Sequence, residues 1–91
     1  MRLDLFLKAS RLVKRRTMAQ ELCDAGNVQV NGHSAKPAKE IKPGDALRLS
    51  YSTRTIEIEI LSVPALSKNV KTPPEELYRV IGEHRIQRED S

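Results

Sequence analysis

Apolar residues at the start of the chain recur at the three- and four-residue spacing of an amphipathic helix. Leu3, Phe6 and Leu7 begin this stripe, and further apolar positions extend it to Val13. Residues spaced in this way lie on one face of a helix, where they can be buried together. The pattern therefore predicts a helix over about residues 3–13.

A second helical pattern follows a short basic segment. Thr17 and Gln20 have the spacing of a capping box, in which each side chain satisfies a backbone amide near the other residue. Gly26 is typical of the position just beyond a helix C-terminus, because glycine adopts the left-handed conformation needed there. We expect a helix from Thr17 to about Ala25. Its apolar face consists of Met18, Ala19, Leu22 and Cys23.

The middle of the chain alternates apolar and polar residues, which predicts the strands of a small antiparallel sheet. Between the first two strands, Asn31 and Gly32 form a dipeptide that strongly favours a two-residue hairpin turn. A Pro-Gly turn at residues 42–45 leads into the next strand. The alternating segments are residues 27–30, 33–35, 46–51 and 55–60.

The C-terminal third of the chain is less regular. Residues 64–71 have the composition of a linker, and residues 72–75 form a second capping-box pattern with proline at the first helical position. We expect a short C-terminal helix that ends near Gly82, followed by a charged tail over residues 83–91 that frays. The apolar residues at helical spacing in this helix are Leu77, Val80 and Ile81.

Together these elements predict an α+β fold. Two N-terminal helices pack on a small, twisted, mainly antiparallel sheet, and a short C-terminal helix follows. We divide the chain into a domain over residues 1–63 and a segment over residues 64–91, which holds the linker, the short helix and the charged tail.

The composition argues against an enzyme. Only three of the 91 residues are aromatic, so the core must be built mainly from aliphatic side chains. A core this small leaves little room for a cofactor pocket, and we expect no cofactor. The two histidines, His33 and His84, and the single cysteine, Cys23, are too few and too scattered to suggest a metal site.

The sequence also indicates a soluble, cytoplasmic protein. Because Cys23 is the only cysteine, no disulfide can form within the chain, which suits a reducing compartment. We expect Cys23 to be a small core residue rather than a reactive thiol. Asp4 and Lys8 interrupt the N-terminal apolar pattern before it could serve as a signal peptide. No run approaches the ~20 apolar residues of a membrane span.

The positive charge is concentrated in the first half of the chain. Residues 1–45 contain nine basic and five acidic residues, which accounts for the whole net charge of +4. A basic helix face is often simply solvated, but charge this localised favours a polyanion such as a nucleic acid. A helix N-terminus behind Lys14, Arg15 and Arg16 suits phosphate, because backbone amides and side chains point the same way.

RNA fits this pattern better than DNA. A helix that reads the major groove usually exposes Asn, Gln and Arg, whereas Glu21 and Asp24 on the second predicted helix would repel phosphate. Glu57 and Glu59 are expected to face away from the core, and they argue that this face of the sheet does not meet RNA. The cations lie instead at the helix junction and beside the hairpin, which suits recognition of folded RNA by its shape and phosphates.

Several motifs in residues 1–62 resemble the S-four RNA-binding domain, named after the small-subunit ribosomal protein in which it occurs. The order and spacing of these motifs make the resemblance specific. It implies two helices packed on a small twisted sheet, with RNA bound along the helix pair and the first hairpin. The matching residues are Arg2-Leu3-Asp4, Phe6-Leu7, Arg11, Lys14, Arg16-Thr17, Ala19, Gly26, Val28, Val30-Asn31-Gly32, Lys36-Pro37 and Lys42-Pro43-Gly44-Asp45.

Among stand-alone bacterial proteins with this domain, the chain resembles the ribosome-quality-control type more than the heat-shock type, which has a far more basic C-terminal extension. The resemblance implies a protein, monomeric away from the ribosome, that binds a stalled large ribosomal subunit carrying peptidyl-tRNA. It would contact the tRNA and the large-subunit rRNA, and it would support a partner protein that adds alanines to the nascent chain. The alternatives are a heat-shock-type rescue factor without tailing, a regulator that binds messenger RNA or DNA, and a subunit of an enzyme whose catalytic partner is another chain.

The resemblance assigns RNA contacts to the helix pair and the first hairpin. Basic residues near the helix junction would bind phosphates, and residues on the hairpin side would make second-tier contacts. Asp4 either favours the helix N-terminus by its charge alone or also holds Arg2 or Arg16 in position. His33 would be either solvated or a further contact. The candidate RNA-binding residues are Arg2, Asp4, Lys8, Arg11, Lys14, Arg15, Arg16, Thr17, Gln20, Asn31, Gly32, Lys36 and Lys39.

Overall fold

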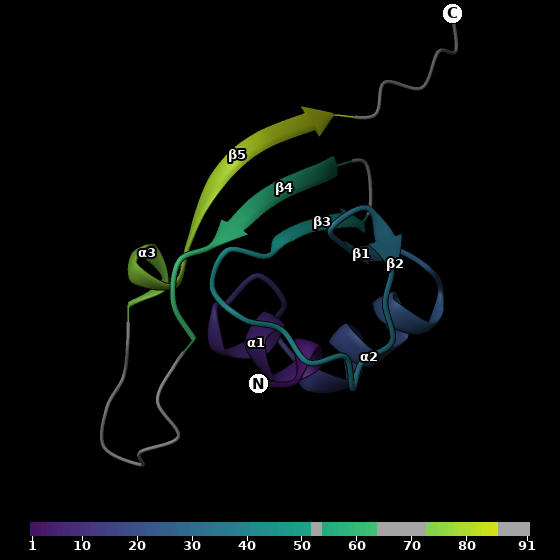
Figure 1. Cartoon of the computed structure of the whole chain (residues 1–91). Helices are drawn as coiled ribbons and strands as arrows, with labels where there is room; N and C mark the ends of the chain where they lie inside the picture. The colour runs from purple at the N-terminus through teal and green to yellow at the C-terminus, as the bar shows by residue number, and fades with distance from the viewer. Residues whose placement is uncertain (52–53, 64–72, 86–91) are drawn as a thin grey trace, which may run out of the picture.

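The computed structural model describes residues 1–51, 54–63 and 73–85, which form a helix layer on a sheet (Figure 1). Helices α1 (Leu3–Ala9) and α2 (Arg16–Asp24) lie against one face of a five-stranded antiparallel sheet of order β2-β1-β3-β4-β5. The short helix α3 (Pro74–Leu77) precedes β5. The expected α+β fold is confirmed. The strands are β1 (Val28–Val30), β2 (His33–Ser34), β3 (Ala46–Tyr51), β4 (Arg54–Ile60) and β5 (Tyr78–Arg85).

The core lies between the helix layer and the sheet. Leu3, Phe6 and Leu7 of α1 are fully buried, and they belong to one cluster with the inward-facing residues of β1, β3 and β4. Burial of one such side chain contributes about 1.5–3 kcal/mol. On β4, Glu57 and Glu59 are more exposed than the isoleucines beside them, as the alternation predicts. The buried apolar residues of these three strands are Val28, Val30, Leu47, Leu49, Ile56, Ile58 and Ile60.

Helix α1 is shorter than the helix predicted over residues 3–13. It ends at Ala9, and Arg11 then adopts the left-handed conformation, with φ 65°. The chain folds back there, so that the Val13 amide donates a hydrogen bond to the Leu7 carbonyl and the Val13 side chain enters the core. Val13 therefore lies in a loop, with its side chain in the core. Burial of this side chain favours the turn over continuation of the helix.

Helix α2 begins without the predicted capping box. Arg15 occupies the N-cap position and no side chain caps the helix, so the capping role predicted for Thr17 and Gln20 is wrong. The Gln20 side chain instead donates a hydrogen bond to Asp4. A cap contributes about 1 kcal/mol, whereas a buried carboxylate that lacks donors costs more. The predicted C-terminus is confirmed, because Gly26 follows the last turn with φ 80°.

The predicted hairpin is confirmed, and its turn is hydrogen-bonded to residues at the start of β3. Asn31 and Gly32 have positive φ values of 53° and 86°, as a two-residue turn of this type requires. The Asn31 amide nitrogen donates to Asp45 Oδ1 at 3.1 Å, and its oxygen accepts a bond from the Ala46 amide at 2.9 Å. These bonds join the hairpin to the predicted turn at residues 42–45, which is also present.

The C-terminal segment differs from the predicted helix. Of the described residues there, Pro74–Leu77 are helical, but Val80 and Ile81 belong to β5, which pairs with β4 at the edge of the sheet. Arg79 forms an ion pair with Glu59 across these strands at 2.7 Å. Without β5 the backbone of β4 would be an unpaired edge, so strand pairing outweighs the helical spacing of the apolar residues.

Other predictions for this segment fall partly outside the described residues. Residues 83–85, expected in a frayed tail, form the end of β5. The predicted linker at residues 64–71 and the tail at residues 86–91 lie outside the described residues. The division of the chain at residue 63 stays a prediction.

Candidate nucleic-acid interface

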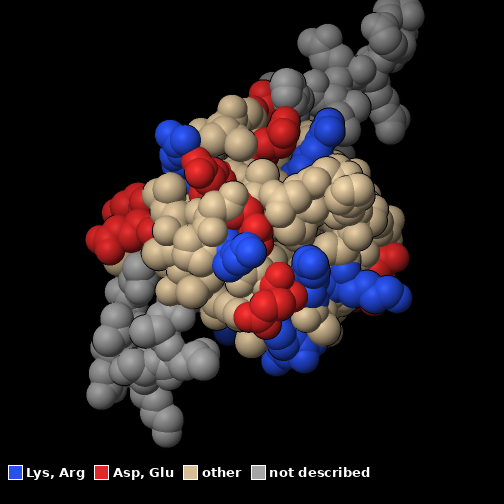
Figure 2. Space-filling model, viewed as in Figure 1, with Lys and Arg blue, Asp and Glu red and all other residues tan. Residues whose placement is uncertain are grey.

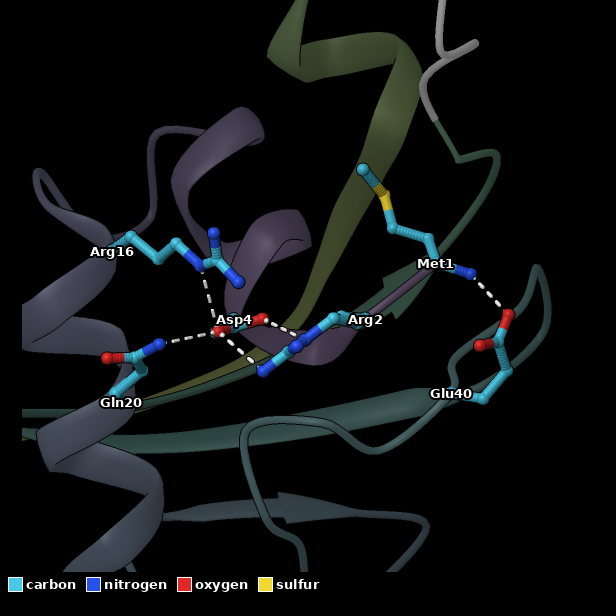
Figure 3. A network of polar contacts seen from close by, with 6 residues as sticks. All are labelled: Met1, Arg2, Asp4, Arg16, Gln20 and Glu40. Atoms are coloured by element: carbon cyan, nitrogen blue, oxygen red, sulfur yellow. Dashed lines mark hydrogen bonds and ion pairs between the residues drawn. The ribbon is translucent and has the colours of Figure 1, made fainter.

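The polar centre of the helix layer is the carboxylate of Asp4, in the first turn of α1. The side chain is fully buried, and it accepts four hydrogen bonds from three side chains (Figure 3). Arg2 approaches with Nε at 3.2 Å from Oδ1 and Nη2 at 3.4 Å from Oδ2. From α2, Arg16 Nε lies 3.1 Å and Gln20 Nε2 lies 3.0 Å from Oδ2. We call these four residues the Asp4 network.

The carboxylate of Asp4 stays ionised because its neighbours outweigh its burial. Burial alone would raise the pKa of Asp4. Hydrogen bonds from Gln20 and Arg16, together with the positive charges of Arg16 and Arg2, lower it, and the net result is a pKa below the ordinary value of 3.8. The buried anion thus holds two cations near neutral pH.

The two guanidinium groups are held on one edge and remain open on the other. Arg16 contacts Asp4 through Nε, and its two terminal nitrogens have no hydrogen-bond partner among the described residues; one of them points away from Asp4 in Figure 3. The side chains of Arg2 and Arg16 are 44% and 43% exposed. A guanidinium oriented in this way is prepared for phosphate, because it loses less freedom on binding. Of the two interpretations of Asp4, the one in which it positions arginines is confirmed.

The remaining basic residues of the helix pair are exposed around this network. Figure 2 shows basic side chains gathered over the part of the molecule where Figure 1 places α1 and α2. At the start of α2 the first amides have no side-chain cap, so they can meet an anion directly. The exposed candidates here are Lys8, Arg11, Lys14, Arg15 and Thr17.

The hairpin side divides into residues that hold the fold and residues that face outward. Asn31 is occupied by its bonds to Asp45 and Ala46, and Gly32 supplies the turn. Lys36 and Lys39 are exposed, so these lysines are the hairpin-side candidates whose side chains are open to a ligand.

Backbone bonds that the sequence did not indicate join the loop after β2 to the Asp4 network. The amides of Leu3 and Asp4 donate to the carbonyls of Lys39 and Pro37, at 2.9 and 3.1 Å. The N-terminal amine also contacts Glu40 (Figure 3). These bonds bring the loop that carries Lys36 and Lys39 beside the start of α1, next to Arg2. No local spacing signals contacts over such separations.

Two further residues considered in the sequence analysis, Cys23 and His33, lie outside the Asp4 network. Cys23 is 5% exposed, and its burial, together with the charges of Asp4 and Asp24, raises the thiol pKa to about 11. Cys23 is therefore a protonated core residue, as expected. His33 is exposed on β2. Within residues 1–51, 54–63 and 73–85, three or more potential metal ligands do not cluster, and no helix is long and apolar enough to cross a membrane.

The chain is similar in sequence and in structure to several known proteins. The family profile of the S4 domain matches residues 1–47. The RQC P-site tRNA stabilizing factor of Bacillus subtilis is 36% identical over 86 residues, covering 94% of this chain and 98% of that protein. The protein of the same name from Helicobacter pylori strain J99 is 46% identical over 78 residues, covering 86% and 92%. The structure of Vibrio cholerae Heat Shock Protein 15, a trimer, covers 88% of this chain and 80% of its own, with a TM-score of 0.76 and 30% identity.

A helix pair on a small antiparallel sheet, together with the profile match over the first half, defines an S4-domain protein. The chain belongs to the S4 domain family, and within that family it groups with the relatives named RQC P-site tRNA stabilizing factor.

Proposed function

We propose that this protein is a non-enzymatic RNA-binding factor of ribosome-associated quality control, which binds tRNA and rRNA on the large ribosomal subunit. The observation that carries the proposal is the Asp4 network, in which a buried carboxylate presents Arg2 and Arg16 beside an uncapped helix start. The relatives that match over nearly the whole chain are named for stabilising P-site tRNA, which supports the same role here.

The chemistry available at this surface is binding and orientation. Guanidinium groups, lysines and backbone amides recognise phosphate oxygens, which fix the position of an RNA without reading its sequence. Nothing in the Asp4 network offers a nucleophile paired with a base, so we propose that the protein makes and breaks no covalent bond. It would instead hold a tRNA and an rRNA segment in fixed relation.

The finer role that we propose is support of alanine tailing. A stalled large subunit keeps its peptidyl-tRNA, and a factor that steadies this tRNA would allow a partner protein to deliver alanyl-tRNA repeatedly. The protein would act in the cytoplasm and would be monomeric when it is not on the ribosome. These expectations come from the resemblance to quality-control members of the family, and deletion of the gene should abolish the alanine tails.

Sedimentation through sucrose gradients at two salt concentrations tests the proposal. We expect the protein to migrate with large subunits that carry peptidyl-tRNA, and to dissociate steeply as salt rises, because several phosphate contacts are lost. Arg16→Ala should weaken this association about fivefold to tenfold, as loss of a charge-assisted contact would. Arg48→Ala, an exposed arginine of β3, is the matched control and should have no effect.

A second candidate is the heat-shock type, which would bind the same subunits without tailing. The likeness to Vibrio cholerae Heat Shock Protein 15 favours it, because that chain is similar over 88% of this one. Alanine tails that persist after deletion would select this candidate. Migration at the top of the gradient at both salt concentrations would exclude both candidates and favour a regulator that binds messenger RNA or DNA.

A further inference from the structure

An open groove of about 620 Å³ lies beside the first hairpin, between β2 and the loop that follows it. This is within the ~300–1,000 Å³ range of pockets that hold small ligands. We call it the hairpin groove. Its lining residues are Val30, Asn31, His33, Ser34, Ala35, Lys36, Ala38 and Lys39.

The hairpin groove has an apolar floor and a polar, basic rim. Val30 and Ala35 are buried and form the floor, with 5% and 9% of their surfaces exposed. His33, Lys36 and Lys39 are exposed at the rim, and none of the eight lining residues carries a carboxylate. A ligand that suits this groove has a flat apolar body and an adjacent negative charge.

The groove is already formed in the free protein. The Lys39 amide donates to the Lys36 carbonyl at 2.9 Å, which closes the loop into a turn. At one end of the loop, the Leu3 amide at the start of α1 donates a hydrogen bond to the Lys39 carbonyl. At the other end, the Ala35 amide donates to the Val28 carbonyl. Because the loop is hydrogen-bonded at both ends, it loses little conformational entropy when a ligand binds.

The groove also adjoins the Asp4 network. Pro37, within the loop, accepts a bond from the amide of Asp4, and Arg2 pairs with Glu40 as an isolated bridge. The loop that forms one wall of the groove therefore lies directly beside the start of α1, which carries Arg2.

From these observations we propose that the hairpin groove binds the base of one unpaired, extrahelical nucleotide in the RNA that the protein holds. The inference rests on the proposed function and deepens it, because it names the structural class of RNA that is preferred. The base would lie on Val30 and Ala35, while Lys36 and Lys39 would bind the phosphates that flank it. Bases that are already unpaired are the usual targets of such pockets, since no pairing has to be broken.

Binding of short RNA hairpins tests this proposal. One RNA is a perfect duplex, and the other carries a single bulged aminopurine, a fluorescent analogue of adenine. We expect the bulged RNA to bind about fivefold to tenfold more tightly, at the low end of what base contacts contribute, because no aromatic ring lines the groove. The fluorescence should rise on binding, since the base leaves its stacked neighbours.

Ala38→Leu supplies the specific variant, because residue 38 is exposed at the groove and a larger side chain would occupy it. It should abolish the preference for the bulged RNA and leave duplex affinity unchanged. Ala25→Leu adds the same side chain at an exposed position after α2, and it should keep the preference. Circular dichroism confirms that both variants fold.

The outcomes separate the two proposals. Equal binding of both RNAs by the unmodified protein, or a preference that survives Ala38→Leu, would overturn the groove proposal and leave the proposed function standing. No salt-sensitive binding of either RNA, together with failure to migrate with large subunits, would overturn both.

Discussion

Asp4 of α1 and Gln20 of α2 are joined by a hydrogen bond of 3.0 Å from the glutamine amide to the carboxylate. The same oxygen, Oδ2, accepts the bond from Arg16 at 3.1 Å. Gln20 therefore positions the anion that positions the arginine, and it links α1 to α2. The stability of the helix pair and the presentation of Arg16 should depend on the same bond.

Replacement of Gln20 by methionine removes this donor while keeping the side-chain length. We expect Gln20→Met to lower the free energy of unfolding by about 1 kcal/mol, somewhat less than the usual value of a hydrogen bond to a charged group because Gln20 is itself half-exposed. Urea unfolding followed by circular dichroism measures the change. Gln20 is half-buried, so the apolar substitute has space at the protein surface.

Thr17→Ala provides the contrast, since the sequence predicted Thr17 and Gln20 as partners in one cap. The structure shows no side-chain cap on α2, so Thr17→Ala should change stability by less than about 0.5 kcal/mol. A loss of about 1 kcal/mol from Thr17→Ala would instead restore the capping box and contradict the network.

Removal of the negative charge at the centre should affect both folding and RNA binding. Asp4→Asn keeps the shape of the side chain. It replaces one of the two carboxylate oxygens, which accept from the guanidinium groups, by an amide NH2 group, which cannot accept. We expect a loss of about 1–3 kcal/mol in stability, less than for a fully buried pair because Arg2 and Arg16 are partly exposed. RNA affinity, measured at a temperature where the variant is folded, should fall together with its salt dependence. Unchanged affinity in folded Asp4→Asn would separate Asp4 from arginine positioning.

The elements that the sequence predicted correctly are those with a local cause. Asn31 and Gly32 require left-handed backbone whatever surrounds them, and Gly26 ends α2 for the same reason. The alternation of residues 55–60 is long enough to select a strand and to place its isoleucines inward. The basic residues of the candidate site were predicted from the charge pattern and from the family resemblance, and their contacts with RNA stay predictions.

The elements that were missed depend on distant contacts. Leu77, Val80 and Ile81 fit a helical stripe, but the last two are β-branched, and β4 offers them an unpaired edge some twenty residues away. Val13 also fits the stripe of the first helix, yet it is buried after the chain reverses at Arg11. Local spacing carries no information about which partner is available.

Asn31 was predicted as an RNA contact, and the structure gives its side chain an internal role. Asn31→Ala removes bonds to Asp45 and to the Ala46 amide, and it places an alanine at φ 53°. We expect a loss of about 2 kcal/mol in stability, from the unsatisfied partners and the strained backbone. Asn31→Gly removes the bonds without the strain and should lose less. If Asn31 acts only within the protein, RNA affinity of either variant should be unchanged under conditions where it is folded.

The ionised state of Asp4 should make stability depend on acid. The pKa of Asp4 is below its ordinary value of 3.8 in the folded protein, so folding favours the carboxylate. The stabilisation is complete above the unfolded pKa and is lost as pH falls through the folded pKa. The difference in unfolding free energy between the unmodified protein and Asp4→Asn should therefore be constant from pH 7 to about pH 5, and should shrink below about pH 4.

Urea titrations at a series of pH values measure this difference directly, and taking the difference cancels the titration of the other carboxyl groups. Asp24→Asn removes the same charge from an exposed position at the end of α2 and serves as the control. Its difference from the unmodified protein should stay small throughout, since an exposed carboxylate contributes little to stability. A difference for Asp4→Asn that persists unchanged to pH 2 would mean that the arginines and Gln20 bind the protonated acid equally well, and the charge would then have no part in holding the helix pair.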